Sequence, residues 1–123
     1  MEKILYIDGK PVKLKSTGAF MLRYKQQFHR DALKDLYKLQ EAVEEETNEE
    51  TGETVQIIKD IEALNLEIFF DMIWTLAKTA NPQIPPAMEW LDTFDEFPLE
   101  EILPEALKLI MASMGSTVES KKK

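Results

Sequence analysis

The sequence predicts a mainly α-helical domain with an N-terminal β-hairpin, an α+β fold arranged around one buried central helix. Three observations predict it. Residues 60–80 are apolar over most of a helical circumference, an Asp-Gly pair separates two short strand-like runs, and helical periodicity dominates elsewhere. A chain of 123 residues suffices for one hydrophobic core and is too short for two. We therefore expect one globular domain over residues 1–114 and a flexible tail over residues 115–123.

The segment from Asp60 to Ala80 is the predicted central helix. At about 100° per residue Asp60, Glu67, Asp71 and Lys78 fall on one narrow stripe, while apolar side chains fill most of the remaining arc. A helix this apolar has to be covered on several sides. Glu67 and Asp71 lie in its middle and argue against a membrane span, so we interpret it as a buried helix.

The first predicted element is a β-hairpin. A β-branched and aromatic run over residues 3–7 is followed by Asp8 and Gly9 and then by alternating apolar and charged residues. A tight primed turn requires positive φ, which Gly adopts without strain. We expect Val12 and Leu14 to be turned inward.

Two helices with basic faces are predicted next. Thr17 is placed to cap the first helix, whose apolar row is Phe20, Tyr24 and Phe28. The second helix starts near Asp31 and carries apolar residues at helical spacing as far as residue 43, namely Leu33, Leu36, Tyr37, Leu39 and Val43.

Basic side chains mark the outer faces of these two helices. Arg30, Lys34 and Lys38 recur at four-residue spacing, and Arg23 lies opposite the apolar row of the first helix. Such a row is usually a solvated face. A self-association surface is the alternative, because residues 1–38 carry nine Lys or Arg against four Asp or Glu, a net +5, whereas residues 39–123 carry six against nineteen, a net −13.

Residues 44–53, EEETNEETGE, contain six acidic residues and no apolar side chain. They bury too little surface to offset the entropy of ordering, so we expect a mobile acidic loop over residues 44–56. A functional acidic arm is the alternative. The carboxylates do not match the spacing of an EF-hand calcium loop.

The C-terminal part is predicted to contain a short helix that follows the proline-rich segment 81–86, and a last helix, Leu99 to Met114, that Pro104 should kink or restart. Aromatic residues at spacings of four and three line one face of the short segment, and an apolar row follows the last helix. These aromatics either close the core over the central helix or form a docking surface. The docking hypothesis names Trp90, Phe94, Phe97, Leu107, Ile110 and Met114.

No pattern in the sequence indicates catalysis, a metal or a cofactor. There is no Cys, His29 is the only histidine, and phosphate-binding and dinucleotide-binding glycine motifs are absent. We therefore expect no enzyme activity. A net charge of −8 argues against nucleic acid or an anionic membrane as the main partner, and the cysteine-free chain suits a reducing cytoplasm.

Three blocks of sequence carry a resemblance to a known family. They are KSTGAFMLRYKQQF over residues 15–28, IWTLAKTA over residues 73–80, and EWLDTFDEF over residues 89–97, which is followed by EEILP ending at Pro104. In this order they resemble the tail assembly chaperones of siphophages and prophages of Gram-positive bacteria. The resemblance extends over nearly the whole chain, although the acidic segment 44–53 is longer than the family leads one to expect.

The resemblance implies a small protein in the cytoplasm of the host bacterium that is not part of the mature virion. It implies binding to the tape measure protein during tail morphogenesis, keeping that long helical chain soluble, and helping to recruit tail tube protein. Head-to-tail self-association along the partner is a further expectation from the charge pattern. The alternative function is a small acidic regulatory protein that occupies a basic, nucleic-acid-binding site on another protein.

Overall fold

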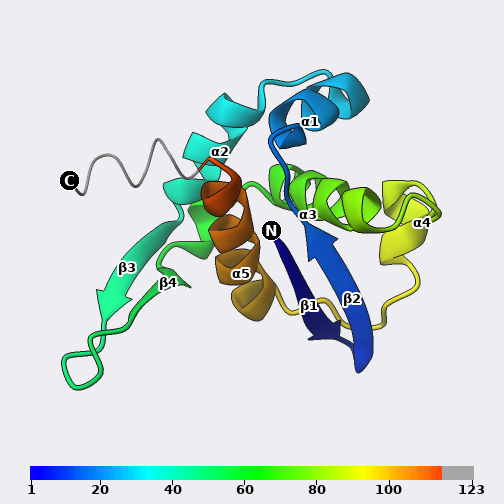
Figure 1. Ribbon diagram of the computed structural model, residues 1–123. Coiled ribbons are helices and arrows are strands. Elements are labelled where there is room, and N and C mark those ends of the chain that lie inside the picture. Colours follow the sequence, from blue (N-terminus) through cyan, green and yellow to red (C-terminus); the bar gives the residue numbers. More distant parts are fainter. Residues whose placement is uncertain (115–123) are drawn as a thin grey trace.

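A computed structural model describes residues 1–114, apart from the side chains of residues 55, 56 and 61; the predicted tail over residues 115–123 lies outside the described part. The described chain folds into five α-helices and two antiparallel β-hairpins, an α+β domain (Figure 1). The expected helical domain with an N-terminal hairpin is therefore present, and the second hairpin was not predicted.

The N-terminal hairpin forms as predicted. Strand β1 (Glu2–Ile7) pairs with β2 (Lys10–Lys15) across a two-residue turn in which Asp8 and Gly9 have φ values of 55° and 74°. Positive φ at both positions matches the right-handed twist of the strands. On the inner face Val12 is 9% exposed and Leu14 is fully buried.

Helices α1 (Phe20–Phe28) and α2 (Ala32–Gln40) follow the hairpin. The predicted start of α2 near Asp31 is confirmed, and Asp31 Oδ1 caps the helix, a role that was not predicted, by accepting hydrogen bonds from the backbone N–H groups of Leu33 and Lys34. The predicted Thr17 cap of α1 is wrong. The hydroxyl of Thr17 accepts from the N–H of Ala19, which occupies the cap position without a side-chain bond, so Thr17 orders the turn before the helix.

The acidic segment is a second hairpin and not the predicted mobile loop. Strand β3 (Val43–Thr47) pairs with β4 (Thr54–Ile58) in antiparallel register. In the turn the side chain of Asn48 accepts from Glu50 N at 2.8 Å, and Gly52 adopts φ 75°. The prediction considered only side-chain burial, whereas this hairpin is held by backbone pairing and local turn bonds.

The central helix is shorter at its start than predicted. A 3₁₀ turn (Ile61–Ala63) precedes α3 (Leu66–Ala80), and the side chain of Asn65 caps α3 by accepting from Ile68 N at 3.1 Å. The apolar pattern continues through residues 61–65, so it does not reveal that the helix begins only at Leu66. The predicted end at Ala80 is confirmed.

The C-terminal elements are α4 (Ala87–Leu91), whose cap position is Pro86, and α5 (Leu99–Ser113), whose cap position is Pro98. Helix α5 passes through Pro104 as one element, so the predicted restart at that residue does not occur.

Helix α3 lies in the middle of the domain, in contact with β2, α1, α2, α4 and α5 (Figure 1). Phe69, Ile73 and Leu76 are fully buried on it. The prediction of a buried central helix is confirmed. The β3–β4 hairpin projects away from this body.

Candidate functional site

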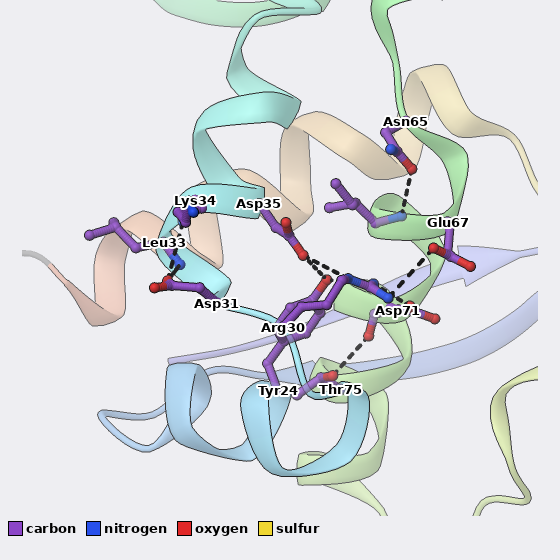
Figure 2. A network of polar contacts seen from close by, with 11 residues as sticks. Tyr24, Arg30, Asp31, Leu33, Lys34, Asp35, Asn65, Glu67, Asp71 and Thr75 are labelled. Atoms are coloured by element: carbon purple, nitrogen blue, oxygen red, sulfur yellow. Dashed lines mark hydrogen bonds and ion pairs between the residues drawn. The ribbon is translucent and has the colours of Figure 1, made fainter.

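A polar network ties the two basic helices to α3 (Figure 2). The guanidinium of Arg30 donates from Nε to Asp35 Oδ2 at 2.9 Å and from Nη2 to Asp71 Oδ2 at 2.5 Å. Nη2 also donates to the Tyr24 hydroxyl at 2.8 Å, and this hydroxyl donates to Asp35 at 2.7 Å. Glu67 adds a longer ion pair of 3.5 Å to Nη1. The network therefore joins α1, the α1–α2 connection, α2 and α3.

Burial and these contacts shift the ionisation of three members of the network. Burial raises the pKa of the Tyr24 phenol, and the hydrogen bond to Asp35 adds to the shift. Burial also raises the pKa of Asp71, against the opposing effect of the Arg30 guanidinium. For Arg30, burial disfavours the charge, but its hydrogen bonds to Asp71, Asp35 and Tyr24 outweigh burial and raise the pKa. A charged guanidinium beside a neutral phenol acts as a structural clamp between helices.

The four residues predicted for self-association lie in different settings. Arg30 is engaged by the network and its side chain is 30% exposed, so little of its hydrogen-bonding capacity is left for a partner. Lys34 and Lys38 are exposed on α2. Arg23 is exposed on α1 and borders a shallow groove of about 240 Å³ between α1 and α3, where Lys78 is a second cation. Self-association through these side chains stays a prediction.

Half of the residues predicted to border a partner surface belong to the core. The buried ones, which are at most 6% exposed, are Trp90, Leu107 and Ile110. The half-buried ones are Phe94, Phe97 and Met114. An apolar row at helical spacing indicates that one face of a helix is covered, but it does not say whether the domain or a partner covers it. In this domain the apolar row of α5 faces the interior. The three buried side chains therefore pack into the core of this domain, and docking of a partner at the other three stays a prediction.

The C-terminal aromatic residues form a cluster that closes over α3. Ring centroids lie 5.2 Å apart between Trp90 and Phe94 and 5.6 Å apart between Phe94 and Phe97. Phe97 continues to Phe69 and Phe70 of α3 at 6.2 and 5.6 Å, with nearly perpendicular rings. Such edge-to-face contacts stabilise a packed core. The simpler of the two interpretations, aromatics that close the core, is confirmed for this cluster.

Large apolar side chains remain exposed on five elements, namely β1, α1, α2, α3 and α4. On β1 Ile4 is 52% and Tyr6 is 72% exposed; on α2 Leu33 is 38% and Tyr37 is 60% exposed; on α4 Met88 is 73% exposed. The sequence analysis named Leu33 and Tyr37 with the other apolar residues of the second helix and did not separate them from the buried ones. The lysine that follows each of them is no signal of exposure, because Tyr24 and Leu107 are also followed directly by a lysine and are fully buried.

Carboxylates cover the β3–β4 hairpin. All six glutamates between residues 44 and 53 are exposed, three on β3 and three in the turn segment. The polypeptide backbone of this hairpin is ordered by strand pairing, so the negative charges are presented on a formed element.

The single histidine has a structural position. His29 ends α1 in the left-handed conformation with φ 58°, and its N–H donates to Lys25 O at 2.8 Å. Within the described residues no group of three or more His, Asp or Glu side chains is arranged to hold a metal ion. In the same part of the chain no helix is long and apolar enough to cross a membrane.

Comparison of the chain with protein-family models, with curated proteins and with solved structures finds no match. A function is therefore inferred from the surfaces of the chain itself. These are exposed apolar side chains on separate faces, a basic face on α2, an acidic hairpin, and an internal clamp that holds α1, α2 and α3 together.

Proposed function

We propose that the chain is a phage tail assembly chaperone, the function implied by its sequence resemblance. The observation that supports it best is the exposure of large apolar side chains on a domain whose core is otherwise closed, led by Tyr6, Tyr37 and Met88. A protein that shields an aggregation-prone helical partner needs accessible apolar surface. The net charge of −8 keeps such a protein dispersed.

In this proposal the chain binds the tape measure protein, keeps it soluble and helps to recruit tail tube protein. It acts through binding alone, without catalysis or a cofactor, in the cytoplasm of the host bacterium, and it is absent from the mature virion. Copies align head to tail along the partner. The separation of basic α2 from acidic surfaces elsewhere favours such an open array over a closed dimer.

Co-expression with the tape measure protein of the same phage or prophage tests the proposal. The chain should move most of the tape measure protein from the pellet to the supernatant of a lysate and should co-purify with it. A tape measure protein that stays insoluble at the same expression level in the presence of the chain contradicts the proposal.

The acidic hairpin favours a second candidate function, an acidic regulatory protein that occupies a basic site on another protein. Its six exposed glutamates lie on an element that projects from the body (Figure 1). A regulator of this kind displaces DNA from its target in a competition assay. Replacing the hairpin residues 45–56 by a two-residue Asn-Gly turn should abolish that displacement, whereas shielding of the tape measure protein should persist.

A further inference from the structure

Helix α2 presents an apolar pair on its outer face. Leu33 and Tyr37 are separated by four residues, so their side chains are neighbours on one side of the helix. Leu33 is 38% exposed and Tyr37 is 60% exposed, whereas Leu36 and Leu39 on the opposite face are at most 2% exposed. The helix is thus packed on one side and carries an uncovered apolar row on the other.

Two lysines flank this row. Lys34 and Lys38 each follow an exposed apolar residue and are themselves exposed. Among the described residues neither lysine forms an ion pair with a carboxylate within 4.0 Å. Ion pairs engage other lysines of the described chain, namely Lys3, Lys13, Lys15 and Lys108. This face therefore combines apolar area with two positive charges that form no ion pair within 4.0 Å among the described residues, in a protein of net charge −8.

The outer face of α2 is held rigidly from behind. Asp31 caps the N-terminus of the helix with two hydrogen bonds, and Asp35, on the buried side, is fixed by Arg30 and the Tyr24 hydroxyl (Figure 2). A surface that is already ordered loses little conformational entropy on binding, which increases affinity for a given contact area. Tyrosine is also a residue type that carries binding energy at interfaces.

We propose that this face, the α2 stripe formed by Leu33, Lys34, Tyr37 and Lys38, docks an amphipathic helix of the partner whose apolar row is flanked by Asp or Glu. The apolar pair takes the partner's apolar row, and the two ammonium groups meet the flanking carboxylates. A partner helix with basic flanks is repelled by the same lysines. The proposal rests on the proposed function, because the long helical partner in that function would contain such a helix.

Two synthetic peptides of about 20 residues serve as probes, since shorter isolated helices are marginal in water. Both carry the same leucine row, flanked by Glu in one peptide and by Lys in the other. In amide chemical-shift titrations of the full-length chain, the Glu-flanked peptide should shift the signals of the α2 stripe and bind at least tenfold more tightly than the Lys-flanked peptide.

Variants of the α2 stripe test whether the peptide binds there and whether the apolar pair and the two lysines determine its affinity. Tyr37→Asp should weaken binding of the Glu-flanked peptide at least tenfold. The double substitution Lys34→Glu and Lys38→Glu should reverse the preference toward the Lys-flanked peptide. Gln26→Asp, which introduces the same charge at an exposed position of α1, is the matched control and should leave affinity within twofold of the unaltered chain. All altered side chains are exposed, and far-UV circular dichroism checks that each variant folds.

Three results overturn the proposal. They are equal affinity for both peptides, shifts confined to surfaces other than α2, and concentration-dependent shifts of the α2 signals without peptide that persist at about 1 M salt, where electrostatic contacts between copies are screened; such shifts would assign the apolar pair to a second copy of the chain. Its failure is distinguishable from failure of the proposed function. If the peptides do not discriminate but the chain still keeps the tape measure protein soluble, only the docking site is wrong; discrimination without solubilisation contradicts the proposed function and leaves the site standing.

Discussion

Asp35 is a carboxylate on the buried face of α2, a position that usually holds an apolar residue. It is 4% exposed and is satisfied by two donors, the Arg30 Nε group and the Tyr24 hydroxyl. Because these donors come from α1 and from the α1–α2 connection, one side chain fixes the packing of three segments. Asp71 anchors the same guanidinium to α3.

Replacing Asp35 by Ala should lower the free energy of unfolding by about 2 to 4 kcal/mol, because it leaves the guanidinium and a buried phenol without their shared acceptor. Urea unfolding measures the change. Glu67→Ala is the matched control, since Glu67 contacts the same guanidinium at 3.5 Å but its side chain is 75% exposed. It should cost less than about 1 kcal/mol, and equal losses in the two variants would show that the buried network does not stabilise the fold.

Glu105 gives a prediction about pH. A hydrogen bond from Lys3, followed in effect by the charges of Lys108 and Lys3, holds its pKa below the usual value against the opposing effect of burial. A carboxylate with a lowered folded-state pKa stabilises the fold above its ordinary pKa of about 4.3, and the contribution is lost as the pH falls through the lowered value.

Glu105→Gln should therefore cost about 0.5 to 1 kcal/mol at pH 7 and much less at pH 3. Thermal unfolding at the two pH values measures the difference from the unaltered chain. Glu49→Gln, in the exposed turn of the acidic hairpin, is the control and should have no effect at either pH. If the loss of stability caused by Glu105→Gln were larger at pH 3 than at pH 7, the ion pairs of Glu105 would not stabilise the fold as described.

At the scale of elements, sequence patterns predicted those parts whose cause is local. The Asp8-Gly9 turn and the start of the second helix near Asp31 are set by residues within a few positions, and both form as expected. The acidic hairpin was missed because its first strand, β3, lacks the alternation of a half-buried strand. Burial was harder to predict. The rows of α2 and α5 have similar spacing, and only the tertiary packing decides that Tyr37 is exposed and Leu107 is buried.

The start of α3 provides a test at this scale. Asn65→Ala should lower the free energy of unfolding by about 1 kcal/mol, because the side chain caps the helix by accepting from Ile68 N at 3.1 Å. Asp60→Ala, at the start predicted from the apolar pattern, removes only the acceptor for Glu62 N in the 3₁₀ turn and should cost less. A larger loss at Asp60 in urea unfolding would contradict the observed start of the helix.

At the scale of the whole molecule, charge is distributed unevenly. The first 38 residues carry a net +5 and the remainder −13, and Figure 1 places α2 and α4 at opposite sides of the domain. Met88 on α4 is exposed, and Glu89 beside it and Asp92 one turn further on are exposed as well, so an acidic surface lies far from the basic one. A heterologous contact between these surfaces of successive copies does not close on itself.

Light scattering at increasing salt concentration tests head-to-tail association. The mean mass should exceed that of a monomer at about 0.01 M salt and fall toward it at about 1 M, because the screening length shrinks from about 30 Å to about 3 Å. Lys38→Glu should reduce the mass at low salt, whereas Lys25→Glu, on α1, should not. A mass independent of salt would exclude an electrostatic contact between copies.

The central claim, that the chain shields a long helical partner, is tested most directly by a dilution experiment. Tape measure protein unfolded in denaturant is diluted into buffer that contains the chain, and turbidity is followed with time. The account predicts that the chain suppresses turbidity in a concentration-dependent manner. Turbidity as high as with an equal mass of an unrelated acidic protein of similar size would contradict it.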